Sequence, residues 1–281
     1  MRININMKSL SIYSGYKKNI TENATAMERI SSGSKINSAK DNPLKIDQSE
    51  KLKMQIRSLE MASKNVQDTT SMVQTADTAM GTISEVLIRM KELVVKGASS
   101  TNTEYDKQVI QTEIEELTNY IEDTANNTEF NGNKILSNAN VTDNNKPFYM
   151  EMQTGSNVGD SMMIPFFNVS SKVLGIDTLD VTTEDGTTEA LKNIDKALVN
   201  VNSCRSSYGA IQGRLETTAE IISSGTYVYE KSSSDINDAD IALEMAEIAR
   251  TSILMESATA MMAQSNNFPK DMLNILANLR K

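Results

Sequence analysis

The chain of 281 residues contains no histidine, no tryptophan and one cysteine. Without imidazole there is no His-based catalytic triad, no histidine metal cluster and no histidine proton shuttle. A lone Cys204 forms no internal disulfide and supplies no paired thiolates for zinc or an iron–sulfur cluster. We therefore expect no cofactor and no metal, and we expect that the chain is not an enzyme.

Glycine, proline and positive charge are also scarce. The 12 glycines and 4 prolines fall well below the roughly 12% expected of an average chain, which indicates long uninterrupted helices. The 37 acidic side chains outnumber the 28 basic ones and give a formal charge of −9. Nonspecific affinity for nucleic acid comes from clustered Lys and Arg, so we expect no nucleic-acid partner.

Long apolar runs are missing as well. The apolar stretches are interrupted by charge every few residues, as in 241–247, so we expect no membrane-spanning segment. The first residues carry no apolar run of signal-peptide length, which predicts no cleaved leader.

Apolar residues instead recur every seven positions, the spacing of a coiled-coil seam. The first row is Leu52, Leu59, Val66, Val73, Met80, Leu87 and Val94. The second row is Ile194, Val201, Tyr208, Leu215, Ile222 and Tyr229. Between these two rows, Ile110, Ile114, Leu117 and Ile121 follow a 4-3-4 spacing. A helix over 52–94 would be about 64 Å long and must pair along its length, so the middle of the chain predicts a long antiparallel coiled-coil rod.

A small β-structure is expected between the second and third long helices. Apolar and polar residues alternate over 148–153, and an apolar run over 162–169 follows a polar turn, which predicts a β-hairpin. Pro165 within the second run indicates an edge strand or a bulge. Asn131-Gly132 is predicted to close the second helix, and Asp185-Gly186 to form the turn before the third.

Both ends of the chain predict amphipathic helices without a partner in the rod. The apolar face of the first is Ile12, Tyr16, Ile20, Met27 and Ile30. The apolar face of the second is Ile241, Met245, Ile248, Met255 and Met262. We expect Asp41-Asn42-Pro43 to break the first helix and 266–269 to interrupt the second. The helices must pair with each other or with neighbouring copies, which makes these faces candidate assembly surfaces.

Sequence motifs at both ends, in matching order, carry a resemblance to a known family. At the amino end they are MERISSGSKINSAKD at 27–41, MQIR at 54–57, NVQD at 65–68, QTA at 74–76 and FNG at 130–132. At the carboxyl end they are GAIQGRLE at 209–216, INDADIA at 236–242 and MAQSN at 262–266. Nearly the whole chain resembles bacterial flagellin.

The resemblance implies a mainly α fold with paired terminal helices, over 1–43 and 235–281, that form the inner tube of a filament. It implies a helical rod with a β-hairpin over 44–234. The segment 137–183 is too short for the outer variable domains of larger flagellins. The expected function is a structural subunit that polymerises into the extracellular flagellar filament for motility after unfolded export through the flagellar type III channel.

Two alternatives stay open at this point. The sequence Asn42-Pro43-Leu44 resembles the corresponding motif of the hook–filament junction protein. Asp238-Ala239-Asp240, followed by Glu244-Met245, instead favours a filament subunit. A non-flagellar helical coiled-coil scaffold would also show heptads, but it would not explain the motifs at both ends.

The expected partners follow from the same resemblance. They are further copies of the chain, an export chaperone on 235–281, the hook–filament junction and cap proteins, and a vertebrate Toll-like receptor. Arg89, Leu93 and Glu113 match the helical patch that this receptor senses in flagellins. Terminal helices without a full core should be disordered in the monomer and should order on docking. Cys204 lies three positions after Val201, in the heptad between Ala197 and Ile211, and is expected to be buried filler in the seam.

Overall fold

A computed structural model describes residues 6–99, 101–137, 141, 144 and 146–278, with the backbone alone described from 271 onward. The helices are α1 (Met7–Ser32), α2 (Pro43–Gly97), α3 (Glu104–Asn127), α4 (Ser171–Leu174), α5 (Glu184–Asn237) and α6 (Ile241–Asn278). The strands are β1 (Glu129–Phe130), β2 (Asn133–Lys134), β3 (Phe148–Gln153) and β4 (Ser161–Phe166). Among the described residues, no helix is long and apolar enough to cross a membrane.

The chain divides into two compact units, which we describe separately. The terminal unit comprises 1–54 and 228–281, and the bundle unit comprises 55–227. The mainly α fold with paired terminal helices and small hairpins confirms the predicted fold class.

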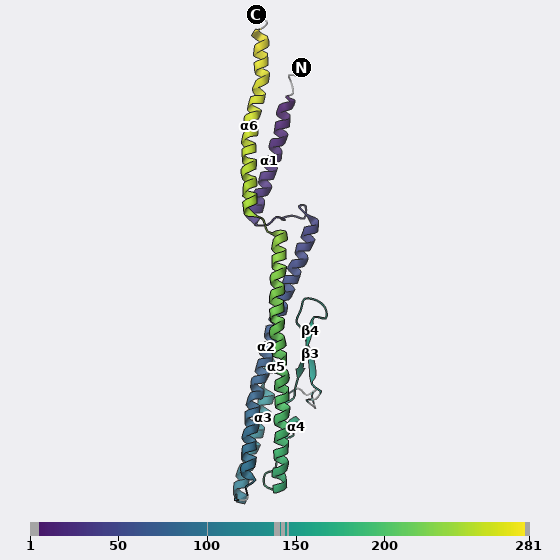
Figure 1. Cartoon of the computed structure of the whole chain (residues 1–281), viewed down its shortest axis with the longest axis vertical. Helices are drawn as coiled ribbons and strands as arrows, with labels where there is room; N and C mark the ends of the chain where they lie inside the picture. The colour runs from purple at the N-terminus through teal and green to yellow at the C-terminus, as the bar shows by residue number, and fades with distance from the viewer. Residues whose placement is uncertain (1–5, 100, 138–140, 142–143, 145, 279–281) are drawn as a thin grey trace. The chain divides into compact units, whose positions relative to one another are not determined.

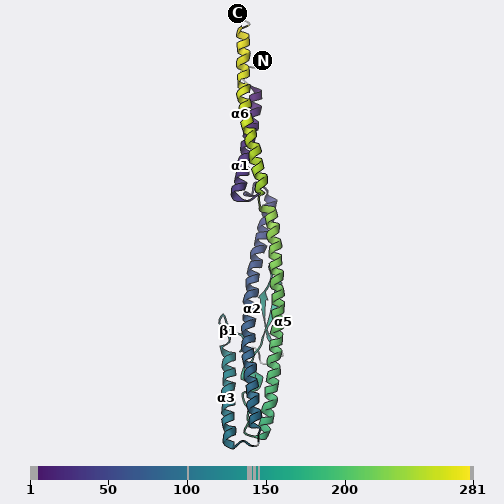
Figure 2. The same cartoon turned by 60° about the vertical axis from the view of Figure 1, so that its left-hand side comes forward.

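In the bundle unit, α2 and α5 lie side by side and α3 runs along α2 (Figures 1 and 2). All residues of the two predicted heptad rows in this unit, from Leu59 to Val94 and from Ile194 to Ile222, are at most 8% exposed. Leu52, in the terminal unit, is half-buried. Thr69 is a buried polar residue of the same seam, three residues after Val66, and its hydroxyl donates to the carbonyl of Asn65 at 2.6 Å, so the buried polar atom is satisfied within the helix.

Exposed ion pairs link the helices of the bundle. Lys91 Nζ lies 2.6 Å from Asp195 Oδ1, and Arg205 Nε lies 2.9 Å from Asp77 Oδ1, both between α2 and α5. Exposed pairs of this kind contribute little to stability, so the buried apolar rows hold the bundle together.

The predicted hairpin is β3 paired with β4, antiparallel from Phe148 opposite Phe166 to Gln153 opposite Ser161. Met162, Ile164 and Phe166 are buried, whereas Met163 between them is 55% exposed. One face of the hairpin therefore covers the bundle. Both strands of a two-stranded sheet are edges, which accommodates Pro165.

Two turn predictions need correction. The second helix, α3, already ends at Asn127, and Asn131-Gly132 instead turns the short β1–β2 hairpin with φ of 52° and 78°. Asn and Gly are the residues that tolerate this left-handed backbone. Asp185-Gly186 lies inside the first turn of α5, where the Thr183 hydroxyl accepts from the Gly186 N–H at 3.2 Å. A Cβ at position 186 would lie 2.7 Å from the Asp180 carbonyl oxygen, so this close approach of the backbone favours glycine.

The segment after β4 is fixed to α3 by two polar side chains. Gln111 donates to the Leu179 carbonyl at 2.8 Å and accepts from the Val181 N–H at 3.1 Å. Glu122 Oε2 accepts from the Ser171 N–H at 2.8 Å and from its hydroxyl at 2.7 Å. Partial burial would raise the pKa of Glu122, but the hydrogen bonds from Ser171 outweigh it and hold this pKa below its ordinary value.

In the terminal unit, α1 and α6 run antiparallel, side by side (Figure 1). Gly33, with φ of 70°, ends α1 in the left-handed conformation, and Asn42 accepts from the Lys45 N–H at the start of α2. Our prediction of a break at 266–269 is wrong, because α6 continues through Pro269.

Candidate assembly site in the terminal helices

The seam between α1 and α6 follows strict 3-4 spacing but is rich in small and polar residues. On α1 the less exposed side chains on this spacing are Ser9, Ile12, Tyr16, Asn19, Asn23, Ala26 and Ile30. On α6 they are Glu244, Ile248, Thr251, Met255, Ala258, Met262, Ser265 and Pro269. Small side chains let two helices approach closely, and Cα atoms of α1 and α6 come within 8 Å of each other.

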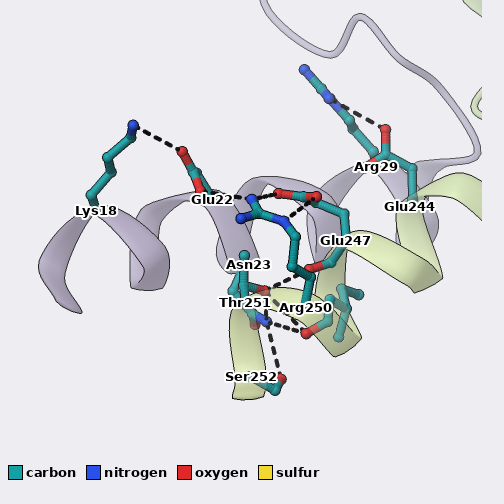
Figure 3. Close-up of polar contacts among 10 residues, drawn as sticks. Lys18, Glu22, Asn23, Arg29, Glu244, Glu247, Arg250, Thr251 and Ser252 are labelled. Atoms are coloured by element: carbon teal, nitrogen blue, oxygen red, sulfur yellow. Dashed lines mark hydrogen bonds and ion pairs between the residues drawn. The ribbon is translucent and has the colours of Figure 1, made fainter. Parts of the chain in front are cut away.

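A polar layer crosses the middle of this seam (Figure 3). Asn23 Nδ2 lies 2.8 Å from Thr251 Oγ1, and the Thr251 side chain is fully buried. The Thr251 hydroxyl in turn donates to the Glu247 carbonyl at 2.8 Å. Each buried polar atom of this layer thus has a partner, so the layer favours one alignment of the helices.

A charged layer lies nearer the start of α6. Arg29 Nη1 is 3.3 Å from Glu244 Oε1, and the Glu244 side chain is only 6% exposed. Glu244 is in the first turn of α6, where the positive end of the helix dipole favours a carboxylate. Removing Arg29 would leave a buried charge without its cation, which is costly.

Arg250 adds an exposed bridge between the two helices (Figure 3). It pairs with Glu247 on its own helix and with Glu22 of α1 at 3.3 Å. The hydrogen bond from Arg250 holds the pKa of Glu247 below its ordinary value. The polar layers and this bridge involve both helices, so they orient the pair as one body.

Twelve of the large apolar side chains of the pair are exposed and lie outside the seam. On α1 they are Met7, Leu10, Tyr13, Ile20 and Met27, 42 to 70% exposed. On α6 they are Ile241, Leu243, Met245, Ile253, Leu254, Met261 and Phe268, 39 to 68% exposed. We call these twelve residues the outward apolar set. A surface of this kind marks a protein interaction site.

The two predicted assembly faces divide between the seam and this outward set. Ile12, Tyr16, Ile30, Ile248, Met255 and Met262 lie in the seam. Ile20, Met27, Ile241 and Met245 lie outward. The sequence analysis treated both groups as one face and so merged two surfaces.

The polar seam residues Asn23, Thr251 and Glu244 were missed by the sequence analysis. A signal was available, because Asn23 lies seven residues after Tyr16 and seven before Ile30. Continuing a heptad row through its polar positions would have found it.

The candidate receptor patch lies in the bundle unit. Arg89 Nη2 on α2 is 3.3 Å from Glu113 Oε1 on α3, and both side chains are about half exposed. Leu93 is only 3% exposed and belongs to the core. The structure therefore brings Arg89 and Glu113 together at the surface and leaves Leu93 beneath them.

A helical bundle combined with a terminal pair that exposes large apolar side chains is typical of the class of helical proteins that associate with other protein chains. Family models support a particular member of this class. The bacterial flagellin N-terminal helical region matches residues 3–141, and the C-terminal helical region matches 191–276.

Individual proteins agree with the family models. The flagellin of Bacillus subtilis is 36% identical over 304 residues, covering 98% of this chain and 100% of the relative. The flagellin of Halalkalibacterium halodurans is 34% identical over 278 residues, covering 98% and 100%. The crystal structure of Bacillus cereus flagellin is similar with a TM-score of 0.50 and 28% identity, covering 56% of this chain and 88% of that one.

The chain belongs to the bacterial flagellin family. It is a structural subunit of the extracellular flagellar filament, as the resemblance predicted.

Proposed function

We propose that subunits polymerise through the outward apolar set of α1 and α6, and that 1–43 and 235–281 form the inner domain of the filament while 44–234 forms the surrounding rod. The observation that carries this proposal is that twelve large apolar side chains of the pair are exposed, while polar residues such as Asn23 and Thr251 occupy part of the seam. Burying one large apolar side chain fully stabilises by about 1.5–3 kcal/mol, so contacts with several neighbours would add up quickly.

The same distribution supports assembly by coupled folding. Among the described side chains of α1 and α6, only Ala26, Glu244 and Thr251 are buried. Ordering a helix costs about 1–2 kcal/mol per residue in backbone entropy, which so small a core offsets poorly. We therefore expect the terminal helices to be largely disordered in the free subunit and to order when neighbours cover their outward side chains.

A substitution on the outward set tests this proposal. Leu243→Asp and Ile253→Asp each place a charge on the outward set, and Met163→Asp is the matched control in the bundle hairpin at similar exposure. Electron microscopy of chain added to short filament seeds should show elongation for the wild type and the control, and none for the two variants. Normal elongation by both variants would contradict assembly through this surface.

The export route and the other partners rest on the family. We propose that the chain leaves the cell unfolded through the flagellar type III channel and that a chaperone holds 235–281 beforehand, covering exposed side chains such as Leu243 and Phe268. Hook–filament junction and cap proteins would contact the same termini at the filament ends. Loss of secretion on deleting 235–281, with the chain retained in the cell, would support this route.

Recognition by a Toll-like receptor would use Arg89 and Glu113 directly and Leu93 only through packing. A receptor that contacts the exposed pair should lose affinity for the monomer with Arg89→Ala. Unchanged binding by the variant monomer would contradict this use of the patch.

A further inference from the structure

Pro269 lies inside α6 and changes the hydrogen bonding of the helix one turn earlier. In an α-helix the N–H of residue i donates to the carbonyl of residue i−4. Proline has no N–H, so the carbonyl of Ser265 has no helical donor at position 269. Helices tolerate an internal proline when another group satisfies the carbonyl that it leaves.

The group that satisfies it belongs to the other helix. Asn6 Nδ2 donates to the Ser265 carbonyl at 2.9 Å and lies 2.9 Å from the Ser265 hydroxyl. The other end of the same amide caps α1, because Asn6 Oδ1 accepts from the Ser9 N–H at 3.2 Å. One side chain thus starts α1 and completes the hydrogen bonding of α6.

We propose that Asn6, Ser265 and Pro269 form a clasp that fixes the register of α1 against α6. A heptad seam repeats every seven residues, so packing alone allows slippage by that interval. Moving Asn6 seven residues back along α6 would place it at Ala258, whose carbonyl has the Met262 N–H as its regular helical donor. The carbonyl left by Pro269 therefore lacks the helical donor that the Ala258 carbonyl has, and Asn6 and Pro269 are positioning residues for the pair.

This inference deepens the proposed assembly, and it rests on that proposal only for its consequence in the filament. A slipped pair would displace the outward side chains of α1 relative to those of α6 by one heptad, about 10 Å. Neighbouring subunits need both sets in one arrangement, so a fixed register sets the shape of the surface on which they dock.

The test distinguishes the two roles of the Asn6 side chain, which are donation from Nδ2 to Ser265 and capping of α1 by Oδ1. Asn6→Asp and Asn6→Ser both keep a good N-cap residue but remove the Nδ2 donor, and they differ in charge. Pro269→Ala restores a helical donor for the Ser265 carbonyl. Asn19→Ser is the matched control, since Asn19 is another half-buried asparagine on the seam face of α1. Each variant is made in the full chain, singly and with Pro269→Ala.

Hydrogen exchange of the amides in 10–16 and 261–269 is then measured by mass spectrometry in the free chain and in seeded filaments. We expect Asn6→Asp and Asn6→Ser to speed exchange about 3- to 10-fold with Pro269 present, the effect of one hydrogen bond. We expect little or no effect of either variant in the Pro269→Ala background, and none from Asn19→Ser. If Asn6 only capped α1, the effect of substituting it would not disappear when Pro269 on the other helix is replaced.

Two results would overturn the clasp: equal effects of the Asn6 variants in both backgrounds, or no protection of 10–16 in either state of the wild type. Seed elongation by the wild type is scored separately. If exchange protection depends on Asn6 but the wild type does not elongate seeds, the proposed assembly is contradicted and the clasp is supported. If the wild type elongates seeds but the Asn6 variants have equal effects in both backgrounds, the clasp is contradicted and the proposed assembly is supported.

Discussion

The bundle unit and the terminal unit use the same heptad spacing, but polar and small residues interrupt the apolar row in the terminal seam far more often than in the bundle seam. In the bundle, Met80, Leu87 and Val94 fill the seam and are fully buried. In the terminal pair, the corresponding positions hold residues such as Asn23 and Thr251, while large apolar side chains face outward. The first unit has a large buried core within one chain, whereas only Ala26, Glu244 and Thr251 are buried among the described side chains of α1 and α6.

This contrast teaches that heptad spacing predicts which face of a helix pairs with another helix. The residue types on that face predict how stable the pair is. Apolar seams supply the free energy of burial, about 25 cal/mol per Å². Polar seams supply little net stability but penalise misalignment, because a displaced donor or acceptor loses its partner.

The largest effect is expected on the free energy of unfolding of the bundle. Leu87→Ala removes a fully buried side chain and should lower the free energy of unfolding of the bundle by about 2–5 kcal/mol. Leu243→Ala, at a side chain 65% exposed, should change it by less than about 0.5 kcal/mol. Urea denaturation of the free chain, followed by circular dichroism, measures both, and similar midpoint shifts for the two variants would contradict the contrast.

A smaller effect should come from the polar seam. Thr251→Val keeps the shape of a fully buried side chain and removes the hydroxyl that accepts from Asn23 Nδ2 at 2.8 Å, the shortest of the three hydrogen bonds of this amide, so it should cost the terminal pair about 1–3 kcal/mol. The depolymerisation temperature of filaments should fall, while the urea midpoint of the bundle stays unchanged. A more stable filament would mean that the seam is an ordinary apolar one.

An effect of about 1 kcal/mol is expected from Glu122, at the low end for a charged hydrogen bond because the side chain is partly exposed. Its pKa is lowered in the folded bundle, so the stabilisation is present above the ordinary pKa of 4.5 and is lost as pH falls through the lower folded value. Glu122→Gln should therefore reduce stability at pH 7 and flatten its decline below about pH 4.5. Parallel urea midpoint curves for variant and wild type across this range would exclude the assigned role.

The smallest effect is expected at Arg89. Its ion pairs with Glu92 and Glu113 are exposed, so Arg89→Ala should leave the urea midpoint unchanged within experimental scatter. A clear loss of stability would show that surface charge holds α2 to α3 more strongly than the apolar core suggests.

The sequence predicts the bundle well because its helical period and its hydrophobicity indicate the same face of each helix. Rows such as Leu59 to Val94 combine period and hydrophobicity, and the β3–β4 hairpin combines alternation with a polar turn. Both patterns report local geometry and burial together.

The terminal unit was harder to predict because its period and its hydrophobicity point to different faces. Ile20 and Met27 are apolar and lie within about one helical face of Ile12 and Tyr16, yet the seam follows Asn19 and Ala26 instead. Pro269 was expected to interrupt α6, but the helix continues, and the Ser265 carbonyl accepts a hydrogen bond from Asn6, 259 residues earlier in the chain. Such long-range hydrogen bonds leave no local pattern.

Cys204 has a consequence for the finished polymer. Its side chain is 3% exposed, and burial raises the pKa of the thiol to about 11. At neutral pH only about one thiol in ten thousand is then ionised, and the thiolate is the form that attacks disulfides. In a filament of many copies, a buried and protonated thiol of this kind would be a poor nucleophile for disulfide exchange with neighbouring subunits.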